Sequence, residues 1–119
     1  MILVVEYYDS ARESLAELLR DEGYEVYEAP DDNTATVLLD QRDFDLILLN
    51  LAEPDALGLL ERVQKLSATT AVLVMSEPDS KDKAVEAVRL GAQGYIMKPV
   101  VFSDLVARVR ALRPFPFRR

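Results

Sequence analysis

Residues 45–50 read DLILLN, an apolar run that ends in the amide Asn50. Within the strand-like stretch 44–49, the apolar residues Leu46 to Leu49 are continuous rather than alternating. Continuous runs are typical of a central strand in a parallel sheet, because helices cover both of its faces. The neighbouring sequence should therefore alternate between strand and helix patterns.

This alternation extends along the whole chain. Strand-like runs lie at residues 2–6, 24–29, 71–75 and 95–98, and amphipathic helical patterns lie at residues 10–23, 32–42, 58–66, 80–90 and 103–112. Strands that are separated by helical crossovers must be parallel, and such crossovers are right-handed. The sequence therefore predicts an α/β fold with a doubly wound parallel sheet and helices on both faces.

Two local signals bound the first helix. Ser10 and Glu13 have the spacing of a capping box, and Gly23 can adopt the left-handed backbone that ends a helix. The strand at 24–29 alternates between apolar and polar residues, which places it at an edge of the sheet.

Composition excludes several classes of protein. The 119 residues suffice for one domain, which we place at residues 1–113, followed by a tail at 114–119. A net charge of −7 disfavours direct nucleic-acid binding. Cysteine and histidine are absent, which excludes disulfides, zinc fingers and imidazole chemistry. The chain has no apolar run that could span a membrane and no secretory signal, so we expect a cytoplasmic domain.

Ligands of doubly wound folds bind beyond the carboxyl ends of the strands. The residues at these positions are Glu6 with Tyr7 and Tyr8, Asn50, Ser76, and Lys98 with Pro99. They are the candidate site residues of the chain.

From Ile2 to Leu112 the chain resembles a receiver domain of bacterial two-component response regulators. The likeness is carried by the LILL run that ends in a polar residue, Pro54-Asp55 with Gly58 after it, VMS at 74–76 and GAQGYIMKP at 91–99. The resemblance implies a flavodoxin-like sheet of five parallel strands in the order 2-1-3-4-5, with two helices on one face and three on the other.

The resemblance also implies a site. In that family an acidic pair after the first strand and an aspartate after the third bind Mg²⁺, and the aspartate accepts a phosphoryl group from a partner kinase. A Ser or Thr and a Lys contact that group, and an aromatic residue in the fifth strand changes rotamer. The corresponding residues of this chain are Glu6 and Tyr7 for the pair, Asn50 for the acceptor, and Ser76, Lys98 and Tyr95 for the others.

Two of these residues cannot perform the family's chemistry. The amide of Asn50 is no nucleophile toward phosphorus, and the phenol of Tyr7 is neutral at physiological pH. Three carboxylates are thus reduced to Glu6, so we expect Mg²⁺ binding to be weak or lost, with no cofactor and no catalytic residue. We expect Lys98 to form an ion pair with Glu6, and its ammonium to lie within hydrogen-bonding distance of Glu6 or of the Asn50 oxygen.

Three functions follow. The first is a phosphorylation-independent receiver in two-component or phosphorelay-type signalling, which is not an enzyme and contacts a protein partner through helix 81–90, strand 95–98 and helix 103–112, as a monomer or weak homodimer. The second is a small-molecule or ion sensor that uses a pocket lined by Tyr7 and Tyr8. The third is a conventional receiver whose pocket has been substituted.

Tyr95 is either the switch aromatic or a cover for the sheet edge. The acidic loop residues are expected to be solvated; they are Glu53, Asp55, Glu77 and Asp79.

Overall fold

The computed structural model describes residues 1–67 and 69–112, and every predicted strand and helix is found there. The strands are β1 (Ile2–Val5), β2 (Val26–Ala29), β3 (Leu46–Asn50), β4 (Ala71–Ser76) and β5 (Gly94–Met97). The helices are α1 (Asp9–Asp21), α2 (Asp32–Gln41), α3 (Ala56–Leu66), α4 (Lys81–Arg89) and α5 (Phe102–Ala111), with a short 3₁₀ turn η1 (Pro78–Ser80) before α4. The predicted tail at 114–119 lies outside the described residues.

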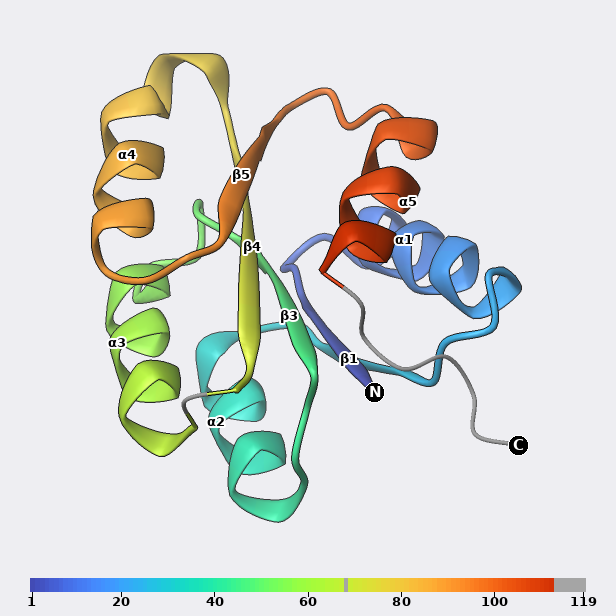
Figure 1. Ribbon diagram of the computed structural model, residues 1–119, viewed down its shortest axis with the longest axis horizontal. Coiled ribbons are helices and arrows are strands. Elements are labelled where there is room, and N and C mark those ends of the chain that lie inside the picture. Colours follow the sequence, from blue (N-terminus) through green and yellow to red (C-terminus); the bar gives the residue numbers. More distant parts are fainter. Residues whose placement is uncertain (68, 113–119) are drawn as a thin grey trace.

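The five strands form one parallel sheet in the order β2-β1-β3-β4-β5, so the predicted order is confirmed. Strand β3 lies in the middle, where Leu46 is paired with Ile2 of β1 on one side and with Ala71 of β4 on the other. Helices α1 and α5 cover one face, and α2, α3 and α4 cover the other (Figure 1). Among the described residues, no helix is both long and apolar enough to cross a bilayer.

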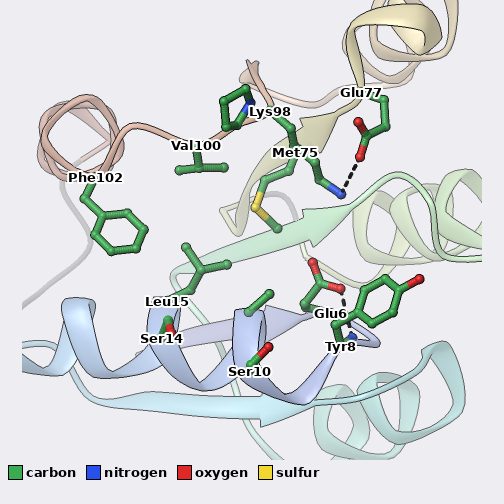
Figure 2. A pocket seen from close by; sticks show the side chains of 12 residues that line it. Glu6, Tyr8, Ser10, Ser14, Leu15, Met75, Glu77, Lys98, Val100 and Phe102 are labelled. Atoms are coloured by element: carbon green, nitrogen blue, oxygen red, sulfur yellow. Dashed lines mark hydrogen bonds and ion pairs between the residues drawn. The ribbon is translucent and has the colours of Figure 1, made fainter.

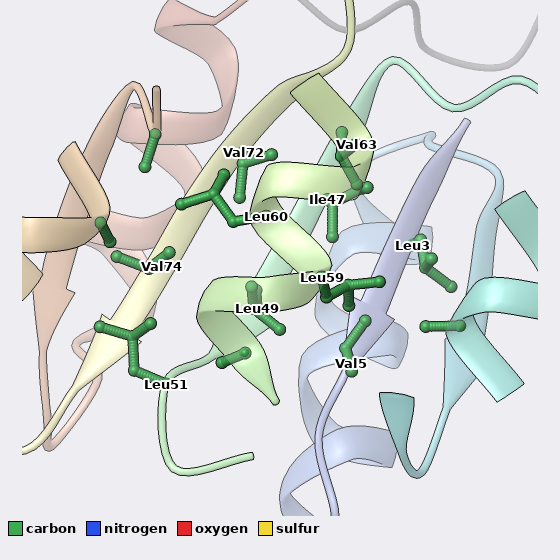
Figure 3. Packing of buried hydrophobic residues seen from close by; sticks show 14 of the residues in the cluster. Leu3, Val5, Ile47, Leu49, Leu51, Leu59, Leu60, Val63, Val72 and Val74 are labelled. Atoms are coloured by element: carbon green, nitrogen blue, oxygen red, sulfur yellow. The ribbon is translucent and has the colours of Figure 1, made fainter. Parts of the chain in front are cut away.

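The central strand supplies side chains to both apolar layers. Ile47 and Leu49 of β3 pack in the layer with α3, where Figure 3 shows them facing Leu59. Leu46 and Leu48 belong to the opposite layer, with α1 and α5. Successive side chains of a strand point to opposite faces, so a strand that is covered on both faces must be apolar at every position.

Glycine ends two of the helices. Gly23 has a φ of 98°, and the N–H of Tyr24 donates to the carbonyl of Leu19 at 3.2 Å. This is the pattern of a Schellman motif, in which a left-handed residue lets the chain turn back onto the last carbonyls. Gly91, with a φ of 117°, ends α4 in the same way.

The predicted capping box is wrong. Helix α1 begins at Asp9 after Tyr8, no side chain caps it, and Ser10 lies within its first turn. The backbone N–H of Tyr8 donates instead to the carboxylate of Glu6 at 3.1 Å. A side chain of the candidate site therefore fixes the backbone that leads into α1.

Candidate functional site

The ends of β1, β3 and β5 bring three of the predicted residues into one hydrogen-bonded chain. The Nζ atom of Lys98 donates to Oδ1 of Asn50 at 2.8 Å, and Nδ2 of Asn50 donates to Oε1 of Glu6 at 3.0 Å. Glu6 and the Asn50 oxygen were the two acceptors predicted for the Lys98 ammonium, and the hydrogen bond is made to the Asn50 oxygen. The amide is 2% exposed, and its oxygen also accepts from the N–H of Ala52 at 3.1 Å. Asn50 therefore bridges a cation and an anion by using both ends of its amide.

The predicted ion pair between Lys98 and Glu6 is wrong. The ion pair that Lys98 makes is with Glu77, at 3.5 Å (Figure 2). The side chain of Glu77 is 53% exposed, so water screens this pair and its contribution to stability is small. Asn50 satisfies both neighbours, because its oxygen accepts from Lys98 while its NH₂ group donates to Glu6.

Glu6 is a buried carboxylate, with an exposed fraction of 3%. Its two oxygens accept from the Asn50 amide and from the Tyr8 backbone N–H, and both of these donors are neutral. Among the described residues, no ion pair involves Glu6. No charged group therefore donates directly to its carboxylate.

The loop that carries Glu6 is held by Arg12 of α1. The guanidinium donates to the Glu6 carbonyl at 3.1 Å and to Asp9 at 2.8 Å, and its Nε donates to Glu28 of β2 at 3.3 Å. Burial by itself would lower the pKa of Arg12, but hydrogen bonds and charge from Asp9 and Glu28 outweigh it and raise the pKa. Arg12 therefore stays charged and ties the loop to the edge strand.

The two tyrosines point largely into solvent. Tyr7 is 66% exposed and Tyr8 is 67% exposed, and their rings meet edge to face at 5.3 Å. Tyr8 lines the cavity beside Glu6, whereas Tyr7 does not, so the predicted pocket lined by both tyrosines is wrong.

The contacts of Ser76 and Tyr95 lie outside the hydrogen-bonded chain of Lys98, Asn50 and Glu6. The hydroxyl of Ser76 donates to the carbonyls of Glu77 and Ser80, at 3.0 and 3.2 Å, so it is engaged in turn η1. The ring of Tyr95 is half-buried and packs against the apolar layer of α2, α3 and α4. Of the two roles left open for Tyr95, this packing is that of a cover for the sheet, and the switch role stays a prediction. The peptide bond between Lys98 and Pro99 is cis.

The expectation that all four acidic loop residues are solvated is wrong for Glu53, which is 3% exposed. Burial raises the pKa of Glu53, repulsion from Asp32 raises it further, and the Tyr7 backbone N–H offsets part of this. Asp32 itself accepts from the Asp55 N–H at 2.8 Å, while its other carboxylate oxygen is buried without a hydrogen-bond partner. The sequence gives no local signal for this burial, because Tyr8 follows the end of β1 at the same distance and is 67% exposed.

Lys83 is a further site residue that no sequence pattern indicated. This α4 side chain donates to the carbonyl of Leu51 at 2.6 Å, directly after Asn50. It therefore links α4 to the end of β3.

Comparison with known proteins identifies the family. The sequence model described as "Response regulator receiver domain" matches residues 2–110 of this chain. The chain belongs to the response regulator receiver family. Among its relatives, the sensory transduction protein RegX3 of Mycobacterium tuberculosis is 33% identical over 113 residues, which are 93% of this chain and 49% of RegX3. The transcriptional regulatory protein ZraR of Escherichia coli is 36% identical over 89% of this chain and 24% of ZraR. The chain therefore spans half or less of the length of these relatives.

Solved receivers have the same fold. The receiver domain of NtrX from Brucella abortus superimposes with a TM-score of 0.88 at 29% identity, covering 94% of this chain and 97% of that one. HP1043, an orphan response regulator of H. pylori, gives a TM-score of 0.84 at 25% identity, covering 94% and 95% of the two chains. The flavodoxin-like fold and the place in two-component signalling are thus established.

The acceptor site of this receiver does not fit the Mg²⁺ ion of the family. Magnesium requires free hard oxygen ligands in an octahedral arrangement. Here the Asn50 oxygen already accepts from Lys98 and Ala52, which occupies both of its lone pairs. Of Glu6, Tyr7 and Asn50, Glu6 alone carries a carboxylate. Within residues 1–67 and 69–112, no three acidic side chains are grouped so that they could hold a metal ion.

Proposed function

We propose that this receiver acts without phosphorylation, as a protein-interaction module in two-component or phosphorelay-type signalling. The observation that carries the proposal is the position of Asn50, whose amide replaces the acceptor and donates to Glu6 at 3.0 Å. An amide nitrogen has a delocalised lone pair and an amide oxygen is neutral, so neither attacks phosphorus. The Lys98 ammonium, which would contact a phosphoryl group, donates to Asn50 instead.

The same proposal assigns no catalytic step and no cofactor to the chain. Mg²⁺ binding is weak or lost, because the Asn50 oxygen already accepts two hydrogen bonds and, of Glu6, Tyr7 and Asn50, Glu6 alone carries a carboxylate. The domain works in the cytoplasm, does not bind nucleic acid by itself because of its net charge of −7, and is a monomer or a weak homodimer.

The interaction surface in this proposal consists of α4, β5 and α5. Val85 and Val88 of α4 are 45% and 41% exposed, and Val101 before α5 is 53% exposed. Beside β5 and α5 lies a hollow of about 490 Å³, to which Tyr95, Val101 and Arg108 contribute. Exposed apolar side chains beside charged ones are typical of protein-binding surfaces.

Strand β5 links this surface to the acceptor position. Lys98, directly after the strand, donates to Asn50, and the Tyr95 carbonyl of the strand accepts from Arg108 of α5 at 3.0 Å. Lys83 connects α4 to the residue after Asn50. The amide therefore holds the surface in one fixed arrangement, which a partner recognises without a phosphoryl signal.

Phosphoryl acceptance tests the proposal directly. The protein is incubated with acetyl phosphate and Mg²⁺, and its intact mass is measured; we expect no added phosphoryl group. The matched control is the double variant Asn50→Asp/Tyr7→Asp, which restores an acceptor and a second carboxylate and should gain the mass. Asn50→Asp alone should gain little, because Tyr7 still denies the metal a ligand. A phosphoryl group mapped to the site of the unchanged protein would refute the proposal.

The interaction surface has a separate test. Val88→Asp places a charge in the proposed surface, and Val37→Asp places one at a 54% exposed valine of α2. Self-association is followed by a sedimentation series, and binding of a protein partner is followed by capture on the immobilised domain. In both experiments we expect Val88→Asp to abolish binding and Val37→Asp to leave it unchanged. Equal behaviour of the two variants would place the contact elsewhere.

A further inference from the structure

A cavity of about 460 Å³ lies between α1 and the segment that joins β5 to α5. Glu6 and Lys98 are at one end of it, and Phe102 is at the other (Figure 2). Its volume is within the range of small-molecule sites in proteins, roughly 300–1,000 Å³.

The walls of the cavity are apolar and firmly placed. Figure 2 shows Leu15 of α1, Met75 of β4, and Val100 and Phe102 after β5 around the same space. Leu15 and Met75 are 5% and 1% exposed and belong to the core beneath the cavity, so this floor is held by the packed interior. Such walls favour a ligand with an apolar body.

The polar end of the cavity has more negative than positive charge. Lys98 supplies one ammonium, and its charge is already met by the Asn50 oxygen at 2.8 Å and by Glu77 at 3.5 Å. Glu6 is 3% exposed and accepts from two neutral N–H donors. An anionic ligand would be repelled by the carboxylates of Glu6 and Glu77. A cationic ligand would give Glu6 a positively charged partner, which its two neutral N–H donors do not provide.

We propose that this cavity binds a small amphipathic amine, with its ammonium group at Glu6 and its apolar body against Leu15, Met75 and Phe102. The ring of Tyr8, at the rim beside Glu6, adds an aromatic face, which also attracts cations. Binding of this kind requires neither a phosphoryl group nor a protein partner, so it stands apart from the proposed function.

Three probes with the same phenylethyl body and different polar groups test the charge preference. Isothermal titration calorimetry is performed with 2-phenylethylamine, with neutral 2-phenylethanol and with anionic 3-phenylpropionate. A hydrogen bond to a buried charged group corresponds to about tenfold or more in affinity, so the amine should bind at least about tenfold more tightly than the alcohol. Equal affinities, tighter binding of the anion, or no binding of the amine at millimolar concentration would each overturn the proposal.

Matched variants locate the site. Ser14→Leu fills the cavity from an exposed position of α1 and should abolish binding of the amine, whereas Ser103→Leu adds the same side chain at an exposed position of α5 outside the cavity and should leave binding intact. Glu6→Gln should remove the preference for the amine over the alcohol. Because Ser14 and Ser103 are exposed, these two variants decide the question even if Glu6→Gln does not fold. Binding that survives Ser14→Leu would refute the site.

Discussion

Two groups of buried polar side chains lie at the carboxyl edge of the sheet, and their charges are compensated to different degrees. In the first group, Asn50 links Lys98 to Glu6, and every acceptor oxygen has an N–H donor. In the second, Glu53 is 3% exposed beside Asp32, and one Asp32 oxygen is buried without a partner. The first group lies at the acceptor position of the proposed function, and it is the better compensated of the two.

Under the proposed function, the difference indicates what an amide at the acceptor position accomplishes. A conventional receiver gathers carboxylates that need a metal ion to offset their repulsion. Here one amide removes that need, because it donates to the remaining carboxylate and accepts from the lysine. The uncompensated acidity of this edge is found a few residues away, at Glu53 and Asp32.

The largest effect is expected from Asn50→Asp. The substitution removes the N–H donor that lies 3.0 Å from Glu6 and leaves two carboxylates in contact. We expect a loss of about 3 kcal/mol in the free energy of unfolding at neutral pH, measured by urea denaturation without Mg²⁺. The loss should shrink in mild acid, because the shared site then keeps a proton in the folded state.

A second substitution makes this test specific to the pair. In a Glu6→Gln background, the glutamine amide can donate to the carboxylate introduced at position 50, so Asn50→Asp should cost less there. The coupling free energy of this double-mutant cycle should be about 1–2 kcal/mol. A coupling energy near zero would show that the two side chains do not depend on each other.

Glu53→Gln should act in the opposite direction and stabilise the protein. Burial and Asp32 raise the pKa of Glu53, so the folded protein holds more protons than the unfolded chain between the ordinary glutamate pKa and the raised one. The free energy of unfolding therefore falls as pH rises through that window, and full stability is present below it. The variant should gain about 1 kcal/mol at neutral pH and show a flatter pH dependence in urea titrations. A loss of stability on this substitution would mean that the Glu53 charge is needed.

Lys98→Met should have a smaller effect. Methionine occupies a similar volume, and the Asn50 oxygen keeps the Ala52 N–H as a donor. The pair that is lost with Glu77 is largely exposed. We expect a cost of about 0.5 kcal/mol in the free energy of unfolding, clearly below that of Asn50→Asp. A cost as large as that of Asn50→Asp would show that the ammonium, rather than the amide, organises the site.

The smallest effect separates the two aspartates near Glu53. Repulsion from Asp32 raises the pKa of Glu53 more than repulsion from Asp31 does. NMR titration of the Glu53 carboxyl should therefore show a larger fall in its pKa for Asp32→Asn than for Asp31→Asn, with less than about 1 kcal/mol of change in overall stability for Asp32→Asn. Asn retains the oxygen with which Asp31 accepts from the Thr34 N–H, so the helix start is preserved in this control. Equal shifts would show that Asp32 has no special place beside Glu53.

The fold follows from local patterns in the sequence. A continuous apolar run indicates a strand that is covered on both faces, and an alternating run indicates a strand with one exposed face. Gly23 and Gly91 mark the ends of two helices. Both signals are local, so they can be read from the sequence. The helix start at Asp9 was missed, since Glu6, rather than a capping serine, takes the backbone N–H there.

Which polar side chains of the site bond to one another becomes visible only in the tertiary structure. Asn50 bonds to groups 44 and 48 residues away, and no local pattern states which of Glu6, Glu77 and Asn50 the Lys98 ammonium selects. The burial of Glu53 and the outward position of Tyr7 likewise depend on how neighbouring loops pack over the sheet edge. Apolar burial is set by a repeating pattern along the chain, whereas partners of polar groups are set by directional contacts between distant segments.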